Sequence, residues 1–96
     1  METGSLDEVR AGIDRLDREI VRLMAERGGF VRRAARFKTS DAEVEAPERV
    51  ERVIAEARAL AAEAGLEPRV AEAAYRAMIA AFIEVEREAF RAEPGV

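Results

Sequence analysis

Lys38 is the residue that points most directly to chemistry, because the other fifteen of the sixteen basic residues are arginines. A lysine offers a compact point charge and an arginine a planar fork, so a single retained lysine indicates a site that needs the smaller cation. Ala34 and Ala35 precede it at helical spacing, and no carboxylate lies three or four residues back. The local sequence therefore provides no counter-ion for this ammonium group.

Arg27 is placed in a similar way, with apolar side chains on either side at helical spacing. Unpaired cations on an apolar stripe are costly unless an anion arrives from elsewhere. Eleven residues are about three helical turns, so in one continuous helix Arg27 and Lys38 share a face, roughly 16 Å apart. The two side chains could clasp a small dianion. The alternative is that both reach solvent or bond a helix end.

Glu86 interrupts an apolar stripe formed by Ile79, Ile83 and Phe90. A carboxyl group there would be partly desolvated, which favours its neutral form unless a cation lies near. The alternatives are an ion pair with an arginine of another helix, or exposure at the edge of the stripe.

Arg10 and Arg49 carry weaker signals. Asp7 and Asp14 lie at helical spacing from Arg10, and Glu45 lies four residues before Arg49. On local evidence both arginines belong to ordinary surface ion pairs.

The composition excludes several kinds of site. The 96 residues include no Cys and no His, so there is no disulfide framework, no zinc cluster and no imidazole base. The net charge of −4, with acidic and basic residues interspersed, argues against nucleic-acid binding, and no apolar run predicts a membrane span. We expect a cytoplasmic protein that uses no metal or cofactor. Chemistry would then depend on positioning and electrostatic stabilisation.

The apolar periodicity predicts an all-α chain of three helices. The first covers residues 6–38, the second begins at Pro47 and closes at Gly65, and the third begins at Pro68 and ends before residues 93–95. We expect residues 1–5 to be a disordered leader with Ser5 as N-cap, residues 6–92 to form one domain, and residues 93–96 to be a tail. The first helix, about 50 Å long, is longer than a compact chain of this size, so a second copy is its expected partner. The polar connector at residues 39–46 is a plausible lid.

Three segments carry a family resemblance: IDRLDREIVRLMAERGGFVRRAARFK, then APERV, then AAFIEVE. Together they resemble the small all-helical chorismate mutases, and within them the isochorismate-pyruvate lyase branch. The resemblance covers residues 6–88. It implies an intertwined homodimer of three-helix chains with two active sites.

The resemblance also implies roles for individual residues. Lys38 would contact the enol-ether oxygen and a carboxylate of the substrate, and Glu86 would meet the same ether oxygen from the other side. Arg27 and Arg49 would bind substrate carboxylates, and Arg10 would reach into the partner's site. The substrate-binding residues expected on this basis are Arg10, Arg27, Arg49, Val50 and Ile83.

Two positions depart from the pattern of the mutases. Many members carry glutamine in place of Glu86, and a glutamate must be protonated to donate to the ether oxygen, which predicts activity that falls as pH rises. Chorismate mutases commonly carry an acidic residue where Val50 stands, so binding of the chorismate hydroxyl is in question. The broadest expected activity is rearrangement of chorismate to prephenate. The alternatives are elimination of pyruvate from isochorismate, action on 4-amino-4-deoxychorismate, and a non-catalytic helical dimer.

Overall fold

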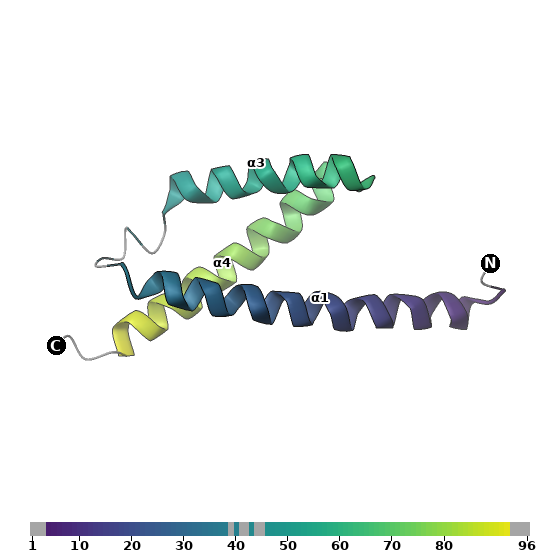
Figure 1. Cartoon of the computed structure of the whole chain (residues 1–96), viewed down its shortest axis with the longest axis horizontal. Helices are drawn as coiled ribbons and strands as arrows, with labels where there is room; N and C mark the ends of the chain where they lie inside the picture. The colour runs from purple at the N-terminus through teal and green to yellow at the C-terminus, as the bar shows by residue number, and fades with distance from the viewer. Residues whose placement is uncertain (1–3, 39, 41–42, 44–45, 93–96) are drawn as a thin grey trace. The chain divides into compact units, whose positions relative to one another are not determined.

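The computed structural model describes residues 4–38, 40, 43 and 46–92 (Figure 1). Three helices cover most of them: α1 (Leu6–Ala35), α3 (Pro47–Ala64) and α4 (Pro68–Ala92). The predicted all-α class and the three predicted helices are thus confirmed. The chain divides into two compact units, residues 1–31 and residues 32–96, and the boundary falls inside α1.

Hydrogen bonds among Gly4, Ser5 and Glu8 define the beginning of α1. The Ser5 hydroxyl accepts a hydrogen bond from the Glu8 amide at 3.1 Å, which satisfies one of the free amides of the first turn. The Glu8 carboxylate in turn accepts from the Gly4 amide at 3.1 Å. Ser5 is therefore the N-cap that the sequence predicts, although Glu8 reaches one residue further back than in a standard capping box.

The end of α1 differs from the prediction. The helix stops at Ala35, and Lys38 lies beyond it. The amides of Arg36, Phe37 and Lys38 each donate to the carbonyl three residues back, at 3.1–3.2 Å. The apolar periodicity did not reveal this tightening, because the segment contains no glycine or proline stop signal.

Local chemistry also fixes both ends of α3. Pro47 occupies the first turn, where its missing amide costs nothing, after Ala46 with a left-handed φ of 38°. At the other end Gly65 has φ of 78°, and its amide donates to the Ala62 carbonyl while the Leu66 amide donates to Ala61. These two bonds form a Schellman motif, so Gly65 closes the helix as predicted.

The helices α3 and α4 pack together through small side chains. Ala57 and Ala61 of α3 and Ala71 of α4 form a buried cluster, and Tyr75 packs against it. Alanine at a helix crossing lets the two backbones approach closely, so this pair is held at short range. Of these two helices, α4 carries Glu86, a residue of the candidate site described below.

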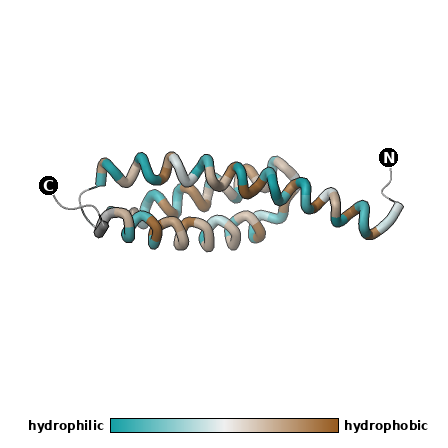
Figure 2. Tube along the Cα trace, turned by 90° about the horizontal axis from the view of Figure 1, so that it is seen from below, coloured by the Kyte–Doolittle hydropathy of each residue, from teal (hydrophilic) through white to brown (hydrophobic). Residues whose placement is uncertain are grey.

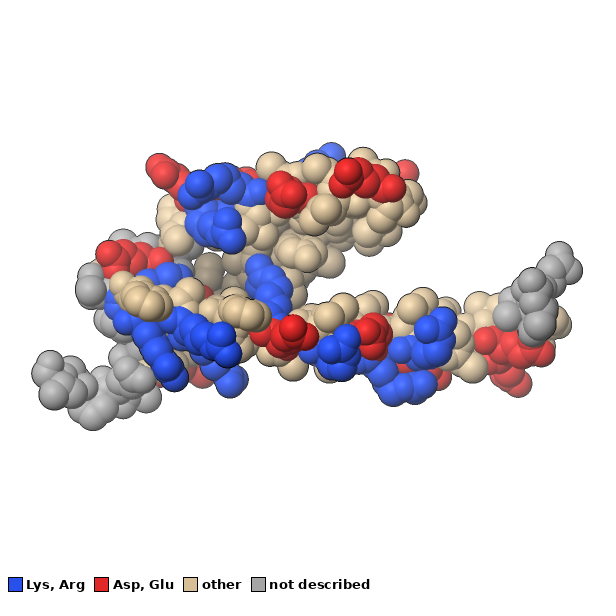
Figure 3. All heavy atoms as spheres, viewed as in Figure 1, with Lys and Arg blue, Asp and Glu red and all other residues tan. Residues whose placement is uncertain are grey.

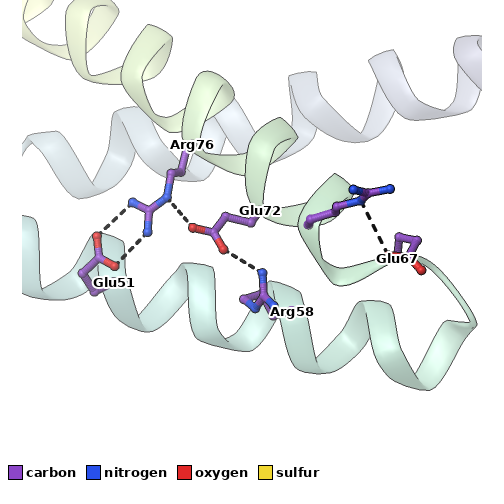
Figure 4. A network of polar contacts seen from close by, with 6 residues as sticks. Glu51, Arg58, Glu67, Glu72 and Arg76 are labelled. Atoms are coloured by element: carbon purple, nitrogen blue, oxygen red, sulfur yellow. Dashed lines mark hydrogen bonds and ion pairs between the residues drawn. The ribbon is translucent and has the colours of Figure 1, made fainter.

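A chain of ion pairs adds a polar connection between α3 and α4 (Figure 4). Arg76 donates to both Glu51 carboxylate oxygens at 2.9 and 3.0 Å and to Glu72 at 2.8 Å, and Arg58 donates to Glu72 at 2.7 Å. The Arg76 hydrogen bond lowers the pKa of Glu51, and the bonds from Arg76 and then Arg58 lower the pKa of Glu72. The network is solvent-exposed, so it contributes orientation more than stability.

The apolar stripe of α1 remains open to solvent within one chain. Leu6, Val9, Ile13, Leu16, Ile20 and Leu23 are each between 42% and 62% exposed. Figure 2 shows the corresponding alternation of hydrophobic and hydrophilic segments along this helix. The helix therefore carries a long apolar stripe whose side chains are exposed among the described residues. No described helix is long and apolar enough to cross a membrane.

Candidate active site

Lys38 and Glu86 meet in the unit formed by residues 32–96. The Lys38 ammonium donates to the Glu86 carboxylate at 3.2 Å. The Glu86 side chain is only 6% exposed, and that of Lys38 is 23% exposed. The two groups come from segments 48 residues apart, so the fold, rather than local sequence, pairs them.

This pair corrects the prediction that Lys38 has no counter-ion. No carboxylate lies near it along the chain, but α4 presents one in space. The alternative in which Glu86 is exposed is also wrong, because its side chain is buried. The expected ion pair with an arginine is wrong as well, since Glu86 pairs with Lys38 instead. The structure confirms that Glu86 is desolvated and places a cation beside it.

The predicted helix through both Arg27 and Lys38, on which their shared face depended, is also wrong, because α1 ends at Ala35. Arg27 is half-buried and makes an interaction of its own, so it is not an unpaired cation either. The helix itself continues through Gly28 and Gly29, of which Gly28 is buried.

The position of Glu86 follows from the periodicity of α4. Phe82 and Ile83 lie four and three residues before it, on the same helical face, and both are half-buried. Ile79 continues this face one turn earlier and is also half-buried. The carboxylate thus lies at the end of an apolar stripe, where hydration is poor and a neighbouring cation has a large effect.

The remaining predicted residues divide between the two units. Arg10 lies with Arg27 in residues 1–31 and is exposed. The predicted pairing of Arg10 with Asp7 and Asp14 is wrong, since the Arg10 guanidinium forms no ion pair or hydrogen bond with any of the described residues. Its guanidinium is therefore available to a group outside its own chain.

Arg49 and Val50 lie in the first turn of α3, where Arg49 is exposed and Val50 is half-buried. Glu45, the predicted partner of Arg49, and most of the predicted lid at residues 39–46 lie outside the described residues. Among the residues that are described, Arg49 has no ion-pair partner. Lys38 and Glu86 are thus the two predicted site residues that the structure brings into contact.

The pairing of Lys38 with Glu86 could have been found from the sequence. Each residue is a charge without a local partner in apolar surroundings, and the two charges are opposite. Treating them as complementary would have suggested the contact.

The described part of the chain contains no group of three metal-ligating side chains. The chemistry available here is therefore that of a buried, charge-assisted hydrogen-bond pair.

Comparison with known proteins places this site in a family. The family model of chorismate mutase type II matches residues 9–87, which include every predicted site residue. The chain belongs to the chorismate mutase type II family. It is also 34% identical over 90 residues to an isochorismate pyruvate lyase of Pseudomonas aeruginosa, covering 94% of this chain and 89% of that protein. The resemblance inferred from the sequence is thus confirmed.

Proposed function

We propose that this protein is a cofactor-free enzyme that rearranges chorismate to prephenate, with Lys38 and Glu86 on the ether oxygen of the substrate. In this reaction the ether C–O bond breaks as a new C–C bond forms, and no proton has to be removed by a base. The observation that carries the proposal is the contact between the only lysine and a buried glutamate in a chain of this family. The missing histidine is no obstacle to such chemistry.

The physical contribution of the pair is electrostatic. Negative charge grows on the ether oxygen as the bond to it breaks, and a fixed ammonium group stabilises that charge more strongly in the transition state than in the ground state. Glu86 assists only when protonated, because an ionised carboxylate cannot donate a hydrogen bond.

The proposal includes a homodimer, supported by the uncovered apolar stripe of α1. The residues Leu6, Val9, Ile13, Leu16, Ile20 and Leu23 are spaced alternately by three and four, the pattern of a coiled-coil seam. Arg27 occupies the next position of the same series. In a parallel, in-register pair each Arg27 would face its own copy, which like charges oppose. An antiparallel pair avoids this clash.

The antiparallel register has a consequence for the site. Opposing Leu6 to Phe30 and Ile13 to Leu23 fills two layers of the seam with apolar side chains. The same register sets Arg27 opposite Val9 of the other copy, next to its Arg10. In this arrangement the second chain supplies Arg10 to a site that contains Arg27, and the two guanidinium groups bind substrate carboxylates.

A second reaction, elimination of pyruvate from isochorismate, is favoured by two observations. The similar Pseudomonas aeruginosa protein is named for this activity. Half-buried Val50 also stands where an acidic residue would hold the ring hydroxyl of chorismate. The ether C–O bond would break while a ring hydrogen moves to the enolpyruvyl methylene carbon, giving salicylate and pyruvate. Lys38 would act on the same ether oxygen.

A substrate comparison tests both reactions. Purified protein is given chorismate, isochorismate and 4-amino-4-deoxychorismate in separate assays, and products are identified by chromatography. Prephenate without salicylate supports the mutase, and salicylate without prephenate supports the lyase. Turnover of the amino compound alone would assign the third alternative. If none is consumed, the proposed function is wrong.

Complementation tests the shared site. Arg10→Ala and Lys38→Met are each expected to be inactive, whereas co-refolded mixtures contain heterodimers with one intact site. Random 1:1 mixing predicts about a quarter of the wild-type activity, since half of the dimers are mixed and each has one working site of two. Arg18→Ala, a change of another exposed α1 arginine, is the control and should keep its activity. An inactive mixture that is shown to contain heterodimers would contradict an Arg10 contribution from the partner.

A further inference from the structure

The end of α1 and the turn after it carry a concentration of positive charge. Residues 32–40 contain Arg32, Arg33, Arg36 and Lys38 and no carboxylate. Because the whole chain has a net charge of −4, the other residues together carry −8. Figure 3 shows Lys and Arg atoms gathered over this end of α1, whereas acidic and basic atoms alternate along the rest of the helix. The positive charge is thus concentrated at this end of α1, whereas the protein as a whole is acidic.

Two of these arginines have side chains without a partner among the described residues. Arg32 and Arg36 are exposed, and the guanidinium group of neither forms an ion pair or hydrogen bond with any described residue. They lie four residues apart in the chain, and two like charges this near each other do not stabilise the segment. If these two residues served only to stabilise the fold, a carboxylate in place of one of them would do so better. Arg32, in the last turn of α1, does offset the helix dipole, but Arg36 lies outside the helix.

Both arginines are near Lys38 in the sequence, and therefore near its contact with Glu86 in space. Arg36 is two residues from Lys38, so their Cα atoms are within about 7 Å. Arg32 is about 9 Å from Lys38 along the chain axis at helical rise. These separations are comparable with the Debye length of about 8 Å at physiological ionic strength. Each arginine can therefore act on an anion at Lys38 without touching it.

We propose that Arg32 and Arg36 form an electrostatic steering site that concentrates the dianionic substrate at Lys38. Lys38 is already neutralised by Glu86, so it exerts little long-range attraction on an approaching anion. The exposed arginines provide that attraction and offset the repulsion from the acidic remainder of the chain. They act on capture of the substrate and leave the bond-breaking step unaffected. This inference rests on the proposed function, because it assumes a dianionic substrate at Lys38.

The size of the effect follows from Coulomb's law. Reversing one charge roughly 10 Å from a dianion in water is expected to lower kcat/KM on the order of fivefold at 0.01 M ionic strength. The same reversal lowers it about twofold at 0.15 M and has almost no effect at 1 M, since the Debye length falls to about 3 Å. The signature is thus a loss of kcat/KM that added salt removes, with kcat unchanged.

The test compares Arg36→Glu with Arg69→Glu in the full chain, using the substrate that the wild type turns over. Arg69 is 85% exposed, and it lies about 26 Å along α4 from Glu86, so its reversal changes net charge equally but far from the pair. Arg36→Gln should show about half the logarithmic effect of Arg36→Glu. A salt-sensitive loss for Arg36→Glu that exceeds that for Arg69→Glu supports steering.

The results separate the failure of steering from the failure of the proposed function. If the wild type is active and Arg36→Glu and Arg69→Glu show the same salt dependence of kcat/KM, the steering proposal is wrong. A lower melting temperature with unchanged kcat/KM would assign Arg36 to stability and would also overturn it. If the wild type turns over none of the three chorismate-type compounds, the function fails, and steering fails with it.

Discussion

Replacing Lys38 with methionine tests how much the buried contact with Glu86 contributes to the free energy of unfolding. Methionine approximates the length of the lysine stem and removes the charge, so the variant leaves a carboxylate that is 6% exposed without its cation. Two opposite charges 3.2 Å apart attract by about 5 kcal/mol at an effective dielectric constant of 20, and the cost of desolvation offsets much of this. The net value of the pair is therefore small, although breaking it is expensive.

The expected loss for Lys38→Met is about 3 kcal/mol of unfolding free energy, at the lower end of the range for breaking a buried pair, because Lys38 is 23% exposed. Glu86→Gln should cost only about 1 kcal/mol, since the amide still accepts a hydrogen bond from the ammonium group. The double variant should cost no more than Lys38→Met alone. Such non-additivity measures the coupling of the two residues.

These unfolding free energies are measured by urea unfolding at pH 7. The protein concentration is the same for every variant, because the stability of a dimer depends on concentration. Arg58→Met is the matched control. It breaks the 2.7 Å contact with Glu72, which is shorter but has side chains 46% and 31% exposed, so a much smaller loss is expected. If Lys38→Met costs no more than Arg58→Met, Glu86 reaches water and the buried pair is refuted.

Further predictions concern turnover, glycine positions and acid stability. Lys38→Arg should fold normally but lose most turnover in a steady-state assay, because the larger planar group cannot reproduce one ammonium contact. Gly65→Ala should lower the unfolding free energy by about 1 kcal/mol in urea, since φ is 78° there, whereas Gly12→Ala should raise it by a similar amount within a helix. Arg76→Gln should be less stable than wild type above pH 4.5, and the difference in melting temperature should vanish as pH falls through the lowered pKa values of its two glutamates. Equal melting temperatures at neutral pH would show that this network contributes nothing.

The ends of the helices show which parts of the fold the sequence can predict. Pro47, Gly65 and Ser5 have local preferences that specify a helix start or stop, and all three occur as predicted. The end of α1 carries no such residue, and the prediction runs three residues too far. Periodicity identifies a helix, but a terminus without a capping residue depends on tertiary contacts that periodicity does not contain.

The candidate site shows the same division. Lys38 and Glu86 stand out in the sequence because each is a charge in apolar surroundings. Their contact spans 48 residues and depends on how α4 meets the segment after α1, which no local pattern specifies. This pairing also decides what removal of the lysine, as in Lys38→Ala, does to stability. Without a partner, loss of the lysine would be neutral or favourable, whereas beside buried Glu86 it is destabilising for enzyme and non-catalytic protein alike.

Charge balance then indicates where the substrate carboxylates must be bound. Lys38 and Glu86 together are neutral when both are ionised, so the pair cannot compensate a dianion. Protonation of Glu86 would free one positive charge, which is still one short of the two needed. The balance has to come from arginines, and Arg10 and Arg49 have no partner among the described residues. A dianion bound at Lys38 therefore requires guanidinium groups from outside the pair, which is why Arg10→Ala should weaken substrate binding even though the Arg10 side chain has no ion-pair partner among the described residues.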